Sequence, residues 1–229
     1  MTILLWRLKL LTLCKPRLIM KWGKTKKIAN CLHNMKFTLA IPLILSLLLS
    51  QIVKGQEVVT YQLDISKTEL VWKGEKLTGY HYGNLVVSNG FIKWLNNAPV
   101  EVKVEIDMNS MTCSDLSGSL SDKLISHLKS KEFFDVENFG KAIFYSDSFT
   151  RIENDSFLVS GNLTIKGISN KISFNAEISR IENEILSSAK VVFDRTLWNI
   201  RYGSDSFFDN LGDKTIYDDI TLDFSLIAH

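Results

Sequence analysis

Apolar and polar residues alternate along most of the chain after residue 57, and this period of two constrains the fold more than any other feature. The clearest run is VEVKVEIDM at residues 100–108, where five apolar residues share one face and four charged residues share the other. Successive side chains of a β-strand point to opposite sides of the sheet, so such a run predicts a strand with one buried and one wet face. Similar runs recur at residues 157–165, 172–178, 189–193 and 220–226. We therefore predict an all-β domain of antiparallel strands, about eight in number.

So many one-sided strands must hide their apolar faces from water. They can form a two-sheet sandwich or curl into a closed barrel, and the pattern leaves both open. Polar turn segments separate the runs, among them Asn89-Gly90, Asn96-Asn97 and Lys166-Gly167. A barrel of about eight strands has an interior just wide enough for packed side chains or for one small ligand.

One segment departs from this pattern and predicts a short helix. Leu120, Leu124 and Leu128 recur at helical spacing in residues 120–131, which places them on one face. Two adjacent aromatic residues, Phe133 and Phe134, then break the helical spacing and form an aromatic corner. We expect this helix between the fifth and sixth strands, as a lid over one opening of a barrel. The alternative is a helix that only packs on a sheet.

The N-terminal 55 residues differ in charge from the rest. They hold ten of the 27 basic residues and no Asp or Glu, which leaves 17 basic against 25 acidic residues and a net charge of −8 for residues 56–229. A basic start at Met35-Lys36, an apolar run at residues 37–49 and small residues after it are typical of a secretory signal peptide. We predict a signal peptide at 35–55 with cleavage after Gly55, and interpret 1–34 as an upstream extension translated from too early a start. Intact-mass measurement of the exported protein tests this, because retention of residues before 35 would contradict it.

The predicted location is thus periplasmic or secreted, with a signal anchor as the competing interpretation. The acidic balance argues against a nucleic-acid partner. Cys113 is the only cysteine after residue 55, so no internal disulfide is expected, and no zinc-ligand spacing occurs.

Several segments together resemble the YceI-like family, periplasmic lipocalin-like proteins that bind polyisoprenoid lipids. The most specific block is the helix followed by KEFFDV, an Ala-x-Phe strand and GNLTIKG at residues 161–167. The likeness extends over residues 58–228, with matching pieces at 61–64, 70–72, 79–83, 90–92, 104–108, 124–135, 142–144, 159–167 and 193–203. The chain departs from the family where Asn138-Phe139 replaces the usual Tyr-Pro pair, which predicts a changed turn.

The resemblance implies an elongated antiparallel barrel around a long apolar tunnel that holds the tail of a quinone or another isoprenoid. The expected partners are an isoprenoid or other amphiphilic lipid, bound without a further cofactor or metal, and a transient contact with a membrane. We expect a monomer or a homodimer. Large apolar residues of the predicted strands, helix and corner are the candidate ligand contacts, with ordinary core packing as the alternative for each: Trp72, Phe91, Val104, Ile106, Leu124, Leu128, Phe133, Phe134, Phe144, Phe157, Leu163, Phe174, Phe193 and Phe224.

Two other classes of function stay open. A barrel enzyme could use His81 or His127 as acid or base, with Asp64, Asp107 or Asp194 as the partner. The chain has no nucleophile elbow, phosphate loop or metal motif, so we expect no enzyme and expect both histidines to be dispensable for holding an apolar tail. A ligand-free interaction module would lack an internal cavity. Residues 195–213 could form a polar rim for a headgroup, but a solvated loop is the favoured interpretation.

Overall fold

The structure is a computed structural model that describes residues 57–229, and residues 56–229 form one compact unit. The predicted upstream extension at 1–34 and signal peptide at 35–55 lie outside the described residues. Within the described part, no helix is long and apolar enough to cross a membrane.

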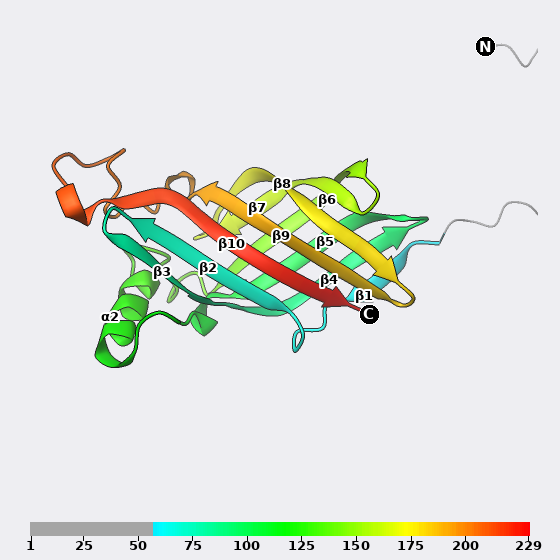
Figure 1. The fold of residues 1–229 in the computed structure, drawn as a ribbon, viewed down its shortest axis with the longest axis horizontal. Helices are drawn as coiled ribbons and strands as arrows, with labels where there is room; N and C mark the ends of the chain where they lie inside the picture. The colour runs from blue at the N-terminus through cyan, green and yellow to red at the C-terminus, as the bar shows by residue number, and fades with distance from the viewer. Residues whose placement is uncertain (1–56) are drawn as a thin grey trace, which may run out of the picture. The chain divides into compact units, whose positions relative to one another are not determined.

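Ten strands and a single α-helix make up this part of the chain (Figure 1). The strands are β1 (Val59–Gln62), β2 (Glu69–Lys76), β3 (Gly79–Asn84), β4 (Val86–Leu95), β5 (Ala98–Asp107), β6 (Lys141–Glu153), β7 (Ser156–Ile165), β8 (Ile168–Ile181), β9 (Glu184–Asp194) and β10 (Ile216–Ala228). The helix α2 (Gly118–Lys129) lies between β5 and β6, as predicted. Short 3-10 turns occur at η1 (Met108–Ser110), η2 (Arg195–Trp198) and η3 (Gly212–Lys214).

All ten strands belong to one antiparallel sheet, in the order β1-β4-β5-β6-β7-β8-β9-β10-β2-β3. Only Leu85 separates β3 from β4, yet β3 pairs with β2 at one end of this order and β4 pairs with β5 near the other. The sheet therefore curls round on itself. At the end of β1 and just after it, the backbone N–H groups of Gln62 and Asp64 donate to the carbonyls of His229 and Ile227, at the C-terminal end of the chain.

This arrangement confirms the predicted all-β, lipocalin-like fold and its antiparallel pairing. The strand count is ten rather than about eight. Residues 79–84 and 86–95 form two strands separated only by Leu85, and the short β1 adds a further one. The turn expected at Asn89-Gly90 lies instead inside β4, beside the bulge in its pairing with β5. The predicted turn at Lys166-Gly167 joins β7 to β8, and both residues have the positive φ that a tight two-residue hairpin requires.

Helix α2 covers less of the apolar interior than its three leucines at helical spacing predict. Leu124 and Leu128 pack against the core, whereas Leu120 in the first turn is 61% exposed. No residue of the helix is fully buried. The aromatic corner that follows is better anchored, because Lys166 Nζ donates to the carbonyl oxygens of Lys131 and Phe133 at 2.9 and 3.0 Å.

The segment after β9 is solvated, as we favoured from the sequence, only in its later part, where residues 205–210 are exposed, whereas its start is buried. Arg195 and Trp198 have no exposed surface, and the Trp198 indole donates to the Leu163 carbonyl at 3.0 Å. The Arg195 guanidinium donates to three backbone carbonyls, those of Ile200 at 2.7 Å, Ile216 at 3.0 Å and Tyr217 at 3.1 Å. Arg195 thus joins η2 to the start of β10 and is not part of a headgroup rim.

Candidate functional site

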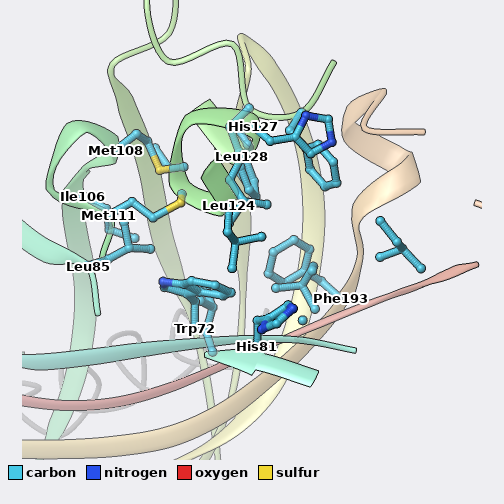
Figure 2. Close-up of a pocket in the computed structure, with 18 of the residues that line it drawn as sticks. Trp72, His81, Leu85, Ile106, Met108, Met111, Leu124, His127, Leu128 and Phe193 are labelled. Carbon is cyan, nitrogen blue, oxygen red and sulfur yellow. The ribbon is translucent and has the colours of Figure 1, made fainter. Parts of the chain in front are cut away.

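Two apolar cavities lie inside the curled sheet. The larger, of about 120 Å³, lies on the side covered by α2 and the aromatic corner (Figure 2). Its lining is almost entirely apolar and comes from β2, β3, β5, β6, β7, β9, β10, α2 and the corner. A cavity that holds one water molecule needs only about 10–15 Å³, so this cavity is larger than a packing defect.

The second cavity, of about 80 Å³, is lined by residues of the strands and has no lining residue from α2 or the aromatic corner. Three rings form part of its wall, with Phe174 between Phe144 and Phe224 at centroid distances of 5.4 and 6.0 Å. Ile106, Leu163 and Leu222 line both cavities. These three side chains, from β5, β7 and β10, therefore form the junction between the two spaces.

The helix and the corner form one wall of the larger cavity. Leu124 and Leu128 face it from α2, and both Phe133 and Phe134 line it. Phe133 is only 4% exposed, whereas Phe134 is half-buried. The predicted meeting of the aromatic corner with the interior is thus present in the structure. Whether this wall opens to admit a ligand stays a prediction.

A polar group lies at the edge of this apolar space. His81 lines the cavity from β3, and its Nδ1 lies 2.7 Å from Oδ2 of Asp115 in the loop between η1 and α2. The other carboxylate oxygen accepts from the Tyr82 backbone N–H at 3.0 Å and from Cys113 Sγ at 3.3 Å. Burial by itself raises the pKa of Asp115, but the bonds from Tyr82, His81 and Cys113 outweigh it and lower this pKa to about 2.

The loop that carries Asp115 is held against β3 as a short extra edge. Thr112 N–H donates to the Asn84 carbonyl at 3.0 Å and Ser114 N–H to the Tyr82 carbonyl at 2.8 Å. The Trp72 indole adds a bond to the Thr112 carbonyl at 2.9 Å. A Cβ at Gly83 would overlap that carbonyl, so glycine is required there for the loop to approach.

The second histidine, His127, also lines the larger cavity, from α2. Its ring packs edge-on against Phe133 and Tyr202, at centroid distances of 4.9 and 4.5 Å. Its Nδ1 lies 3.8 Å from a carboxylate oxygen of Glu132. Neither histidine is paired with the aspartates that the sequence suggested.

Within residues 57–229, no group of three or more His, Cys, Asp or Glu side chains is arranged to hold a metal ion. Cys113 is a free thiol of intermediate exposure.

The structure brings most of the candidate contacts together around the two cavities. The larger cavity takes Trp72, Leu124, Leu128, Phe133, Phe134 and Phe193, the smaller takes Val104, Phe144, Phe174 and Phe224, and both take Ile106 and Leu163. Phe157 is 1% exposed and belongs to the packed core outside both cavities. It is covered by the Arg151 guanidinium, 4.4 Å from the ring centroid.

Phe91 is the clear exception among the candidates. The pairing of β4 with β5 shifts between Val87 and Asn89, and after this bulge Ile92 and Trp94 point inward. Phe91 consequently lies on the outer side, with Lys93 Nζ 5.2 Å from its ring centroid. It lines neither cavity.

Sequence reasoning missed several lining residues. Some could have been found by following the alternation, since Leu222 shares a face with Phe224, and Val102 with Val104. Met108 could also have been found, because it ends the apolar face of the 100–108 run. Met111 carries no such signal, because it belongs to the loop after η1.

A curled antiparallel sheet around apolar internal cavities, with one helix at its side, defines a lipocalin-like fold. Residues 61–228 match the YceI-like domain, so the chain belongs to the YceI-like family.

Curated relatives include two UPF0312 proteins. That of Photorhabdus laumondii is 29% identical over 97 residues, which are 42% of this chain and 48% of the relative. That of Staphylococcus aureus strain RF122 is 31% identical over 99 residues, which are 40% of this chain and 55% of the relative. The chain spans about half the length of the curated relatives it matches.

Solved structures share the fold at low identity. BcnA of Burkholderia cenocepacia superposes with a TM-score of 0.57 at 16% identity, covering 73% of this chain and 99% of that one. A polyisoprenoid binding domain from Saccharophagus degradans gives a TM-score of 0.54 at 15% identity, covering 74% of this chain and 97% of that one.

Proposed function

We propose that this protein binds a polyisoprenoid or another long-tailed amphiphilic lipid, such as an isoprenoid quinone, with the tail inside the two apolar cavities. The observation that carries the proposal is their arrangement in series, joined at Ile106, Leu163 and Leu222. An isoprenoid tail offers no hydrogen bonds, so its binding site must be an apolar space that excludes water. The Saccharophagus domain, described as polyisoprenoid binding, supports the choice of ligand.

The energetics favour a long tail over a short one. Burial of a CH2-sized group contributes about 0.8 kcal/mol, so about 15 tail carbons give roughly 12 kcal/mol before costs. Association removes roughly 4–15 kcal/mol of this through lost translational and rotational freedom and ordering at the site. Only a tail that fills much of both cavities therefore leaves a useful surplus.

The proposed role is carriage, storage or protection of the lipid outside the cytoplasm, without chemical conversion. The lining of the cavities supports this assignment. Its apolar surface provides binding energy for a tail, but it contains few groups that could stabilise a charged transition state. The one feature that favours an enzyme is the His81–Asp115 pair. A ligand recovered unchanged after prolonged incubation with the protein would argue against that alternative.

A tryptophan placed at Phe134 tests the proposal directly. Phe134 lines the larger cavity but is less tightly packed than Phe133, so Phe134→Trp should keep the fold. A long-tailed quinone should quench this added fluorescence saturably, and its tailless headgroup should quench it much more weakly. The background from Trp72, Trp94 and Trp198 is subtracted with the parent protein.

Phe139→Trp is the matched control, because Phe139 follows in the same turn but lines neither cavity. It should show no saturable response to the quinone. If the tailless headgroup quenches Phe134→Trp as well as the long-tailed quinone does, the tail is not bound beside the corner and the proposal fails.

A further inference from the structure

The His81–Asp115 pair places one directed polar atom at an otherwise apolar cavity. In the register of β2 with β3, His81 lies opposite Gly74 and Trp72 opposite Gly83. His81 and Trp72 therefore lie on the same side of the sheet, and the glycine opposite His81 leaves space beside the imidazole. Figure 2 shows the His81 ring directed toward the region between Trp72 and Phe193.

Asp115 determines which ring nitrogen of His81 carries hydrogen. With a pKa of about 2 the carboxylate is ionised at neutral pH and can only accept hydrogen bonds. His81 must then donate through Nδ1, across the 2.7 Å separation. In the neutral imidazole this leaves the lone pair on Nε2, which makes Nε2 an acceptor.

The acceptor has no partner of its own in the part of the chain that the structure describes. Within residues 57–229, His81 bonds to Asp115 alone, and the neighbouring lining side chains Trp72 and Phe193 present carbon toward the shared space. The Trp72 N–H is already used by the Thr112 carbonyl. The His81 side chain is 27% exposed, so a hydrogen bond here is partly shielded from water and is stronger than one at a fully exposed surface.

We propose that Nε2 of His81 accepts a hydrogen bond from the headgroup hydroxyl of the bound lipid, and that the site therefore selects hydroxyl-headed isoprenoids, such as prenols and hydroquinones, over ether- or carbonyl-headed ones. Asp115 acts as a positioning residue by holding the imidazole in one tautomer. This inference rests on the proposed function, because it assigns the headgroup end of the same lipid site. The tail provides affinity and His81 provides discrimination, so His81 can be dispensable for holding a tail and still choose the headgroup.

Direct competition between a C20 prenol and its methyl ether tests this. The two ligands have the same tail and both have an oxygen acceptor, but only the prenol can donate. Native mass spectrometry of the protein with equimolar ligands at pH 8 gives the ratio of bound species. We expect the protein to prefer the prenol by about five- to tenfold, the effect of one neutral hydrogen bond.

His81→Phe should reduce this preference to about onefold while ether binding changes by less than about threefold. His81→Gln, whose amide oxygen can still accept, should restore part of the preference. Asp115→Asn should lower the preference for the prenol to about twofold. The amide can donate to Nδ1, so His81 is no longer restricted to the tautomer in which Nε2 accepts. Tyr80→Phe, one residue before His81 on the outer face, is the control and should keep the full preference.

The two levels of the proposal fail in different ways. Binding of neither ligand would overturn the proposed function, and the headgroup assignment with it. If the unaltered protein binds the prenol and the ether equally, or if His81→Phe keeps the preference, the proposed role of His81 is wrong. The proposed lipid site is not contradicted by either result. Unchanged ether binding and far-ultraviolet circular dichroism show that each variant is folded.

Discussion

Replacing Arg195 by methionine should lower the free energy of unfolding by about 3–5 kcal/mol. The side chain has no exposed surface and donates to the carbonyls of Ile200, Ile216 and Tyr217. Methionine fills similar volume but leaves these acceptors without a donor, and each buried unpaired group costs about 1–3 kcal/mol. It also removes the cation 3.3 Å from Asp218. Since a domain of this kind is stable by about 5–15 kcal/mol, the loss is a large fraction of the total.

Arg195→Lys should recover only part of the loss, because one ammonium group cannot reproduce the planar fork of donors. Burial lowers the pKa of the Arg195 guanidinium, and the Asp218 and Asp194 carboxylates offset part of this effect, so the group stays charged. Arg201→Met is the matched control in the same segment. Arg201 is exposed over the Phe207 ring, and its loss should change stability by less than about 0.5 kcal/mol. Denaturant unfolding measures all three, and a loss below about 1 kcal/mol in Arg195→Met would contradict the structural role.

Filling the junction between the cavities should shorten the tail that the protein accepts. Leu222 lines both cavities and is only partly buried, so Leu222→Phe can place its ring in the free space. Binding of a prenol of 20 or more carbons should weaken at least tenfold, because exclusion of even two tail carbons costs about 1.6 kcal/mol. A ten-carbon prenol that fits the larger cavity alone should bind weakly to both proteins, and Leu222→Phe should change its affinity by less than about twofold.

Leu222→Ala should have the opposite effect and favour long tails, at a cost in stability toward the low end of the roughly 2–5 kcal/mol usual for Leu→Ala, because the site already borders free volume. Val192→Phe is the control, because it adds the same ring to the exposed outer face of the neighbouring β9. Competitive binding of prenols of increasing tail length to each variant measures this effect. Full retention of long tails by a folded Leu222→Phe would show that the tail does not cross this junction.

Much of the architecture was predictable because the relevant signals are local. Alternation along residues 100–108 and 157–165 assigns each side chain to one face of a strand without knowledge of the partner strand. The Lys166-Gly167 turn and the position of α2 between β5 and β6 likewise follow from a few neighbouring residues. The aromatic corner at Phe133 and Phe134 could be connected with the interior for the same reason.

The amino-acid pattern thus predicts the all-β class, the single helix of the folded domain and most of the apolar faces. The remaining positions depend on strand register and on the curl of the sheet, which arise only when distant segments pair. The bulge in β4 turned Phe91 outward, although the sequence predicted that its ring faces the interior. His81 meets Asp115 across 34 residues, and Arg195 reaches carbonyls up to 22 residues away. Alternation cannot encode such contacts, because they depend on which loops fold over which strand. The contact between His81 and Asp115 supplies the polar end of the proposed lipid site.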